Sequence, residues 1–261
     1  MQYVLWQGKA AGSNMNHFGL STVRRPHAVL FDCDGVVVDS EPRMNALLKA
    51  DFARFGLAVD EAGLDELLGG VLSDVAARAR IMGAQLPRDW VDDFYQRLYV
   101  DLARGVPLIP DIERVLDALD AAGIPYGIGS NGSETKLKTT LSQHPDLAAR
   151  FDVVLSGQTL GRPKPAPDLY LAVATALGVE PADCVVVEDS PTGVRAAAAA
   201  GMRCFGYLPD LSGRLEAEGA EEFSTMADLP KLLGIGCQSL RKRSVEPHRC
   251  QDQVGGPRRE R

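Results

Sequence analysis

Short apolar runs alternate along most of the chain with segments in which apolar residues recur at helical spacing. Runs of four or five residues with β-branched or aromatic content are typical of buried strands, and they occur at residues 28–31, 125–129, 152–155, 184–187 and 203–207. Helical spacing occurs at residues 111–122, 134–143, 167–177 and 191–200. Such alternation predicts an α/β fold, a doubly wound parallel sheet buried on both faces.

A different pattern follows the first strand. Apolar residues recur at helical spacing before Gly56 and again before Gly105, and Ser73 is expected to cap a further helix between them. This predicts an inserted α-helical cap domain at residues 42–106, with residues 27–41 and 107–235 forming the catalytic core. We interpret the aromatic residues of the insertion as core residues, and the segment Gly69-Gly70-Val71 as a turn able to point toward a site.

The two ends are expected to lie outside the folded core. Residues 1–26 lack the apolar stretch of a signal peptide and are interpreted as a disordered extension. Residues 236–261 contain seven Lys or Arg against three Asp or Glu. This composition favours a disordered basic tail, with a binding arm for an acidic partner as the alternative.

Composition narrows the classes of partner. The 261 residues carry a net charge of −7, which disfavours nucleic acid or an anionic membrane as the main partner. No stretch has the length of a membrane span. The five cysteines show no Cys-x-x-Cys spacing, so the sequence indicates neither a disulfide framework nor a zinc site, and we expect a cytoplasmic protein.

Polar residues with chemical potential gather where the predicted strands end. In chain order they are Asp32, Asp34, Ser130, Asn131, Lys164 from a loop, Glu188 and Asp189. The carboxyl ends of parallel strands share one edge, so these side chains should meet there. Carboxylate oxygens suit Mg²⁺, while the hydroxyl, the lysine and the amides at a helix start suit an anion. Together they predict phosphoryl transfer.

Each of these features also has a purely structural interpretation. Asp, Asn, Ser and Gly are common in turns and at helix starts, and a lysine between prolines can be a solvated loop residue. None of the four histidines falls at a strand end, so a Ser-His-acid hydrolase lacks its base. Neither a Walker loop nor a dinucleotide-binding fingerprint is present.

Four segments carry a resemblance to a known family. They are Asp32-Cys33-Asp34-Gly35-Val36-Val37-Val38-Asp39-Ser40, Ser130-Asn131-Gly132, Arg162-Pro163-Lys164-Pro165, and Glu188-Asp189-Ser190 followed by Gly193. Over about residues 28–233 the chain resembles the haloacid dehalogenase superfamily of phosphatases, in the branch with a helical cap after the first strand.

The resemblance implies roles for individual residues. Asp32 corresponds to the nucleophile that forms an aspartyl-phosphate, and Asp34 to the general acid and base. Mg²⁺ would be held by Asp32, the main-chain carbonyl of Asp34 and Asp189, with Glu188 nearby or bound through water. Ser130, Asn131 and Lys164 would bind the phosphoryl group, and Lys164 would also screen its charge from the nucleophile.

Two other functions remain as alternatives. A β-phosphoglucomutase-like mutase shares these motifs, but that group carries a histidine after the Asp-Ser segment and an arginine in the specificity loop. Here those segments read Glu41-Pro42-Arg43-Met44-Asn45 and Gly69-Gly70-Val71-Leu72-Ser73. A non-catalytic binding protein on the same fold is the second alternative. We therefore predict a monomeric phosphatase acting on a small phosphorylated metabolite such as a sugar or sugar-acid phosphate.

Overall fold

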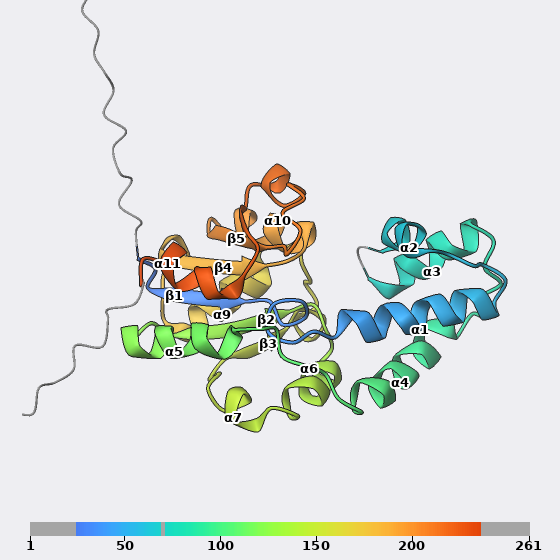
Figure 1. Ribbon diagram of the computed structural model, residues 1–261, viewed down its shortest axis with the longest axis horizontal. Coiled ribbons are helices and arrows are strands. Elements are labelled where there is room, and N and C mark those ends of the chain that lie inside the picture. Colours follow the sequence, from blue (N-terminus) through green and yellow to red (C-terminus); the bar gives the residue numbers. More distant parts are fainter. Residues whose placement is uncertain (1–24, 69–70, 236–261) are drawn as a thin grey trace, which may run out of the picture.

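The computed structural model describes residues 25–68 and 71–235 (Figure 1). The predicted basic tail, almost all of the N-terminal extension, and Gly69 and Gly70 lie outside the described residues. Among the residues described, no helix has both the length and the apolar character needed to cross a membrane.

Parallel strands build a single sheet in the described part of the chain. They are β1 (Ala28–Phe31), β2 (Tyr126–Ser130), β3 (Val154–Ser156), β4 (Cys184–Glu188), β5 (Arg203–Tyr207) and β6 (Glu221–Phe223). Their order is β3-β2-β1-β4-β5-β6, and every pairing is parallel. The predicted α/β fold is confirmed, and β1 lies at the centre between β2 and β4.

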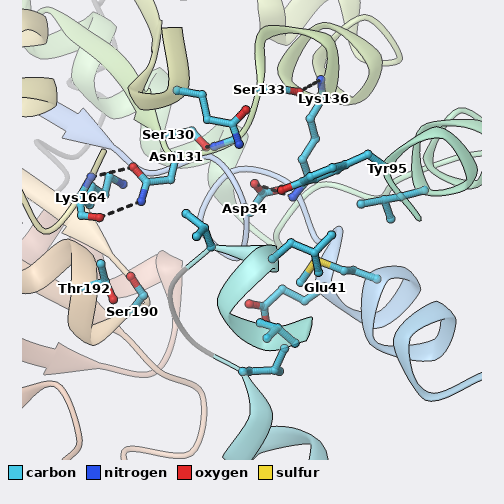
Figure 2. Close-up of a pocket in the computed structure, with 18 of the residues that line it drawn as sticks. Asp34, Glu41, Tyr95, Ser130, Asn131, Ser133, Lys136, Lys164, Ser190 and Thr192 are labelled. Atoms are coloured by element: carbon cyan, nitrogen blue, oxygen red, sulfur yellow. Dashed lines mark hydrogen bonds and ion pairs between the residues drawn. The ribbon is translucent and has the colours of Figure 1, made fainter. Parts of the chain in front are cut away.

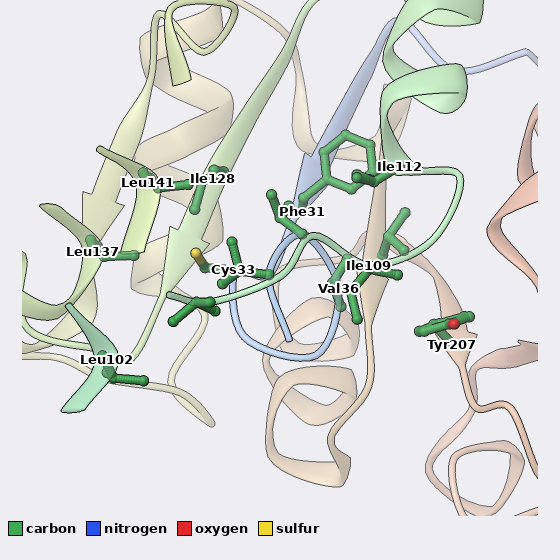
Figure 3. Close-up of a cluster of buried hydrophobic side chains, with 14 of the residues drawn as sticks. Phe31, Cys33, Val36, Leu102, Ile109, Ile112, Ile128, Leu137, Leu141 and Tyr207 are labelled. Carbon is green, nitrogen blue, oxygen red and sulfur yellow. The ribbon is translucent and has the colours of Figure 1, made fainter. Parts of the chain in front are cut away.

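Helices cover both faces of this sheet. They are α5 (Ile112–Ala122), α6 (Glu134–Leu141), α7 (Pro145–Ala148), α8 (Gly157–Leu160), α9 (Asp168–Leu177), α10 (Pro191–Ala199) and α11 (Leu229–Leu232). Successive side chains of a strand point to opposite faces. In β1, Val29 and Phe31 join the apolar cluster that includes Ile112 of α5 (Figure 3), whereas Leu30 packs with Val173 of α9. The sheet is therefore the middle of three layers.

A helical segment stands beside the sheet at its site-bearing edge (Figure 1). It consists of α1 (Glu41–Arg54), α2 (Glu61–Leu67), α3 (Leu72–Ile81) and α4 (Trp90–Leu102). The sequence pattern did not reveal α2, which is capped by Asp60 accepting the Gly63 N–H. The prediction that Ser73 caps a helix was wrong, because α3 already begins at Leu72.

Helix ends in the core follow the local sequence more closely. Ser190 caps α10 by accepting the Gly193 N–H at 3.1 Å, and Pro191 occupies the first turn, as predicted. The edge strand β6 was not predicted from the sequence. It is three residues long and includes two glutamates, so its sequence carries no strand pattern.

Candidate active site

Asp32 directly follows the central strand. Its main-chain N–H donates to the carbonyl of Val187 in β4 at 3.0 Å, so the neighbouring strand fixes its position. The side chain is buried and forms an ion pair with the ammonium of Lys164. Burial, together with the charges of Glu188 and Asp34, raises the pKa of Asp32 to about 7, and the charge and hydrogen bond of Lys164 offset only part of this rise.

Asp34 is held by two partners of its own. The Ser40 hydroxyl donates to Oδ1, and Nζ of Lys136 lies 2.9 Å from Oδ2. Burial lowers the pKa of Lys136, but the charge and hydrogen bond of Asp34 outweigh it, so that pKa is raised. Sequence reasoning missed Lys136, because a lysine in the first turn of α6 gives no signal of the direction of its side chain.

The end of β2 supplies the predicted anion-binding residues. The Ser130 hydroxyl accepts the Gly132 N–H at 3.0 Å, so one amide expected to bind an anion already has a partner. The Asn131 side chain accepts the main-chain N–H of Lys164 at 2.8 Å and donates to its carbonyl at 3.2 Å (Figure 2). Ser130, Asn131 and Lys164 thus meet as predicted, with the Asn131 side chain holding the lysine loop.

Glu188 ends β4 and is fully buried. Its Oε1 lies 2.6 Å from Nζ of Lys164 and accepts the Tyr170 hydroxyl at 2.8 Å. Its Oε2 accepts the main-chain N–H groups of Asp189 and Ser190 at 3.0 Å each and the Ser190 hydroxyl at 2.9 Å. Burial raises the pKa of Glu188, but the Lys164 charge and these hydrogen bonds outweigh it, so that pKa is lowered. Both oxygens of Glu188 thus accept hydrogen bonds from protein donors, and the metal role predicted for Glu188 stays a prediction.

Asp189 lies against a glycine that makes room for it. A Cβ atom at Gly35, whose φ is +77°, would stand 2.0 Å from Oδ2 of Asp189. Burial raises the pKa of Asp189 well above its usual range, and the charges of Glu188 and Asp32 add to the effect. This side chain therefore faces negative charge that a cation would relieve.

The donor set fits a hard divalent cation. In residues 25–68 and 71–235, no three His, Cys, Asp or Glu side chains form a metal-binding cluster. The donors that the family resemblance implies are all oxygens: the carboxylates of Asp32 and Asp189 and the main-chain carbonyl of Asp34. Oxygen donors beside carboxylates of raised pKa suit Mg²⁺ better than a soft metal.

A cavity of about 310 Å³ opens between the sheet edge and the helical segment (Figure 2). Its core side includes Asp32, Asp34, Ser130, Asn131, Lys136, Lys164 and Asp189. Phe94 and Tyr95 of α4, interpreted from the sequence as core residues, also line it. The Tyr99 hydroxyl lies 2.7 Å from that of Ser133, which joins α4 to the start of α6.

The fold and site define an α/β protein with two carboxylates, Asp32 and Asp34, at the edge of a parallel sheet, each paired with a lysine. The family model described as haloacid dehalogenase-like hydrolase matches residues 26–201. The chain therefore belongs to the haloacid dehalogenase-like hydrolase family, as its motifs predicted.

Relatives within this family support the enzyme class. The chain is 33% identical over 216 residues to protein CbbY of Cupriavidus necator, covering 74% of this chain and 82% of that protein. It is 34% identical over 212 residues to the phosphoglycolate phosphatase of Xylella fastidiosa, covering 80% and 91%. A solved hydrolase of the family from Deinococcus radiodurans, with bound phosphate and sodium, has a TM-score of 0.66 and 33% identity over 81% of this chain and 98% of that one. The predicted class of phosphoric monoester hydrolase is supported by these similarities.

Proposed function

We propose that the chain is a Mg²⁺-dependent phosphatase that hydrolyses a small phosphate monoester through an aspartyl-phosphate on Asp32. The arrangement of two carboxylates with two separate cations carries this proposal. Asp32 pairs with Lys164, whereas Asp34 pairs with Lys136 at 2.9 Å. Two neighbouring acids with different partners can take different roles, one as nucleophile and one as proton carrier.

The first chemical step forms the phosphoenzyme. A carboxylate oxygen of Asp32 attacks phosphorus, and the bond between phosphorus and the ester oxygen breaks. Protonated Asp34 gives its proton to the leaving oxygen, so the product departs as a neutral alcohol. Lys164 and the Ser130 hydroxyl stabilise the oxygens of the transferring group.

The second step releases phosphate. Water attacks phosphorus, its proton passes to the Asp34 carboxylate, and the bond between phosphorus and Asp32 breaks. Asp34 is thereby protonated again, and Asp32 returns to its carboxylate form. The Ser40 hydroxyl donates to Asp34 and holds that carboxylate in place during both steps.

The proposed metal ligands are the Asp32 and Asp189 carboxylates and the Asp34 main-chain carbonyl. When bound, Mg²⁺ would offset the negative charge of the carboxylates and the phosphoryl group. Glu188 is left out of this set because its oxygens accept hydrogen bonds from Lys164, Tyr170 and Ser190.

The helical segment α1–α4 is proposed to act as the cap. It supplies one wall of the cavity, and the connections at residues 40–42 and 106–110 would absorb its movement over the site. We also propose that the protein is a cytoplasmic monomer and that its substrate is a small phosphorylated metabolite.

Phosphate release and a nitrophenol burst test the proposal. With Mg²⁺, the wild type should hydrolyse alkyl phosphate monoesters, Asp32→Asn should not, and Asp74→Asn, an exposed carboxylate change on α3, should leave turnover unchanged. Asp34→Asn should lose roughly 10²–10⁴-fold on alkyl esters, which need a proton donor.

p-Nitrophenyl phosphate needs no such donor, so Asp34→Asn should release a burst of nitrophenol equal to the enzyme concentration before slowing. Full activity of Asp32→Asn on any ester would overturn the proposal.

A further inference from the structure

The cavity has two chemically different walls. The wall formed by the sheet edge is polar and charged, as described above. The wall formed by the helical segment is mostly apolar, and its apolar members are Met44 and Leu48 of α1, Leu68 after α2, Val71, Leu72 and Val75 at α3, and Phe94 and Leu98 of α4. The phosphoryl group therefore meets charge, and the remainder of a bound ester meets hydrocarbon.

The cations of the cavity are already matched by carboxylates. Among the described residues that line it, the cationic side chains are Lys136 and Lys164. Lys136 lies 2.9 Å from Asp34, and Lys164 pairs with Asp32 and Glu188. A second phosphate or a carboxylate on the substrate would find no further cation in this lining.

Glu41 makes an anionic leaving group still less favourable. It begins α1 and lines the cavity (Figure 2). Desolvation and the charge of Asp34 raise the pKa of Glu41 above its ordinary value, and the charge of Lys136 offsets part of this rise. Arg214, whose charge also reaches Glu41, is exposed and is not part of the described lining. The Glu41 carboxylate would repel a second negatively charged group on the substrate.

Hydroxyl-rich leaving groups also match this wall poorly. The apolar residues of this wall that expose surface are Met44, Leu68 and Val71, and their side chains offer no hydrogen-bond donors. The Tyr95 hydroxyl is hydrogen-bonded to Gln158, so part of its hydrogen-bonding capacity is already used. A sugar hydroxyl placed here would give up water without gaining a partner, which costs free energy.

We propose that the substrate is a monoester with a single phosphate on an uncharged alcohol, whose aromatic or aliphatic group lies against α1, α3 and α4. This inference rests on the proposed phosphatase function and names the substrate class for that site. It separates the chain from enzymes for sugar acids and bisphosphates, whose second anion requires a cation.

Three esters of primary alcohols test the inference: 2-phenylethyl phosphate, phosphoglycolate and sorbitol 6-phosphate. All are alkyl esters, so differences in kcat/KM report mainly on contacts with the leaving group. We expect 2-phenylethyl phosphate to exceed both others by at least roughly tenfold in the presence of Mg²⁺, since apolar contacts of one or two groups give discrimination of this order.

Equal or higher kcat/KM for phosphoglycolate or sorbitol 6-phosphate would overturn the inference and leave the phosphatase function standing. If neither these esters nor p-nitrophenyl phosphate is hydrolysed, the proposed function fails and the inference falls with it.

Val71 offers a matched pair of variants. It lines the cavity and is 42% exposed, so the fold should tolerate a polar side chain there. Val71→Lys should raise kcat/KM for phosphoglycolate relative to 2-phenylethyl phosphate by about tenfold, because it supplies the missing cation. Val71→Gln, similar in size but neutral, should change the ratio much less. The same ratio in both variants would overturn the argument from charge.

Discussion

Asp51 joins two helices of the helical segment, α1 and α4, both of which contribute to the cavity wall. It lies in α1, is buried, and accepts the Trp90 indole N–H at 2.8 Å. Its two oxygens also accept Arg97 N–H groups at 2.7 and 2.6 Å. Asp51→Asn keeps one acceptor oxygen but turns an amide NH₂ toward these donors. At least one donor of α4, the helix that carries Phe94 of the cavity, is then left unpaired.

The size of the effect follows from the burial of the pair. Breaking a buried ion pair costs about 3–5 kcal/mol. Arg97 is 32% exposed and keeps Asp93 at 3.0 Å, so water and that carboxylate recover part of the loss. We therefore expect Asp51→Asn to lower the free energy of unfolding by about 2–3 kcal/mol. At about 2–4 °C per kcal/mol for a chain of this size, Tm should fall by about 4–12 °C.

Urea unfolding followed by tryptophan fluorescence measures this difference, with Asp93→Asn as the matched control. Asp93 pairs with the same arginine but is 65% exposed, so its loss should cost less than about 1 kcal/mol. If the two variants differ by less than about 0.5 kcal/mol, the assignment of the stability to the buried carboxylate is refuted.

Two further predictions concern the proposed metal site. Gly35→Ala should raise the Mg²⁺ concentration needed for half-maximal activity, because its Cβ would meet Asp189; Gly123→Ala, also at positive φ but with nothing within 4 Å, should cost stability alone. Equal Mg²⁺ requirements would contradict this. The second prediction concerns the dependence of stability on pH. The pKa of Asp32 is about 7 in the fold against an ordinary 3.8, so the unfolded chain loses this proton first as pH rises. Without metal, stability should fall between about pH 4 and 7; Asp32→Asn should flatten the fall, and Mg²⁺ should raise Tm more at pH 8 than at pH 5. A Tm rise independent of pH would count against this account.

Local signals made much of the fold and site predictable. The apolar run before Asp32 and the pair Ser190-Pro191 act within a few residues, so the sequence reveals them directly. The convergence of Ser130, Lys164 and Asp189 was predictable for a different reason, since parallel strands must share their carboxyl edge.

Other features depend on contacts between distant segments. Lys136 of α6 lies 2.9 Å from Asp34, which follows β1, and no spacing in the sequence predicts that approach. The hydrogen bonds that Lys164 and Tyr170 donate to Oε1 of Glu188 likewise join distant segments, and no spacing in the sequence predicts them. The strand β6 exists only through its pairing with β5, since three residues carry no period of their own.

The two hydrogen bonds between the Asn131 side chain and the main chain of Lys164 affect which changes of sequence the site can tolerate. The Asn131 amide accepts the Lys164 N–H and donates to the Lys164 carbonyl, as the main chain of a neighbouring strand would. It thereby joins the lysine loop to the end of β2 across 33 positions of sequence. The loop between β3 and α9 can thus change length or composition while its lysine stays aligned with Ser130. In the described part of the chain, no hydrogen bond joins α1–α4 to Asp32. The wall proposed to bind the alcohol can therefore change while the residues proposed to bind phosphate keep their positions.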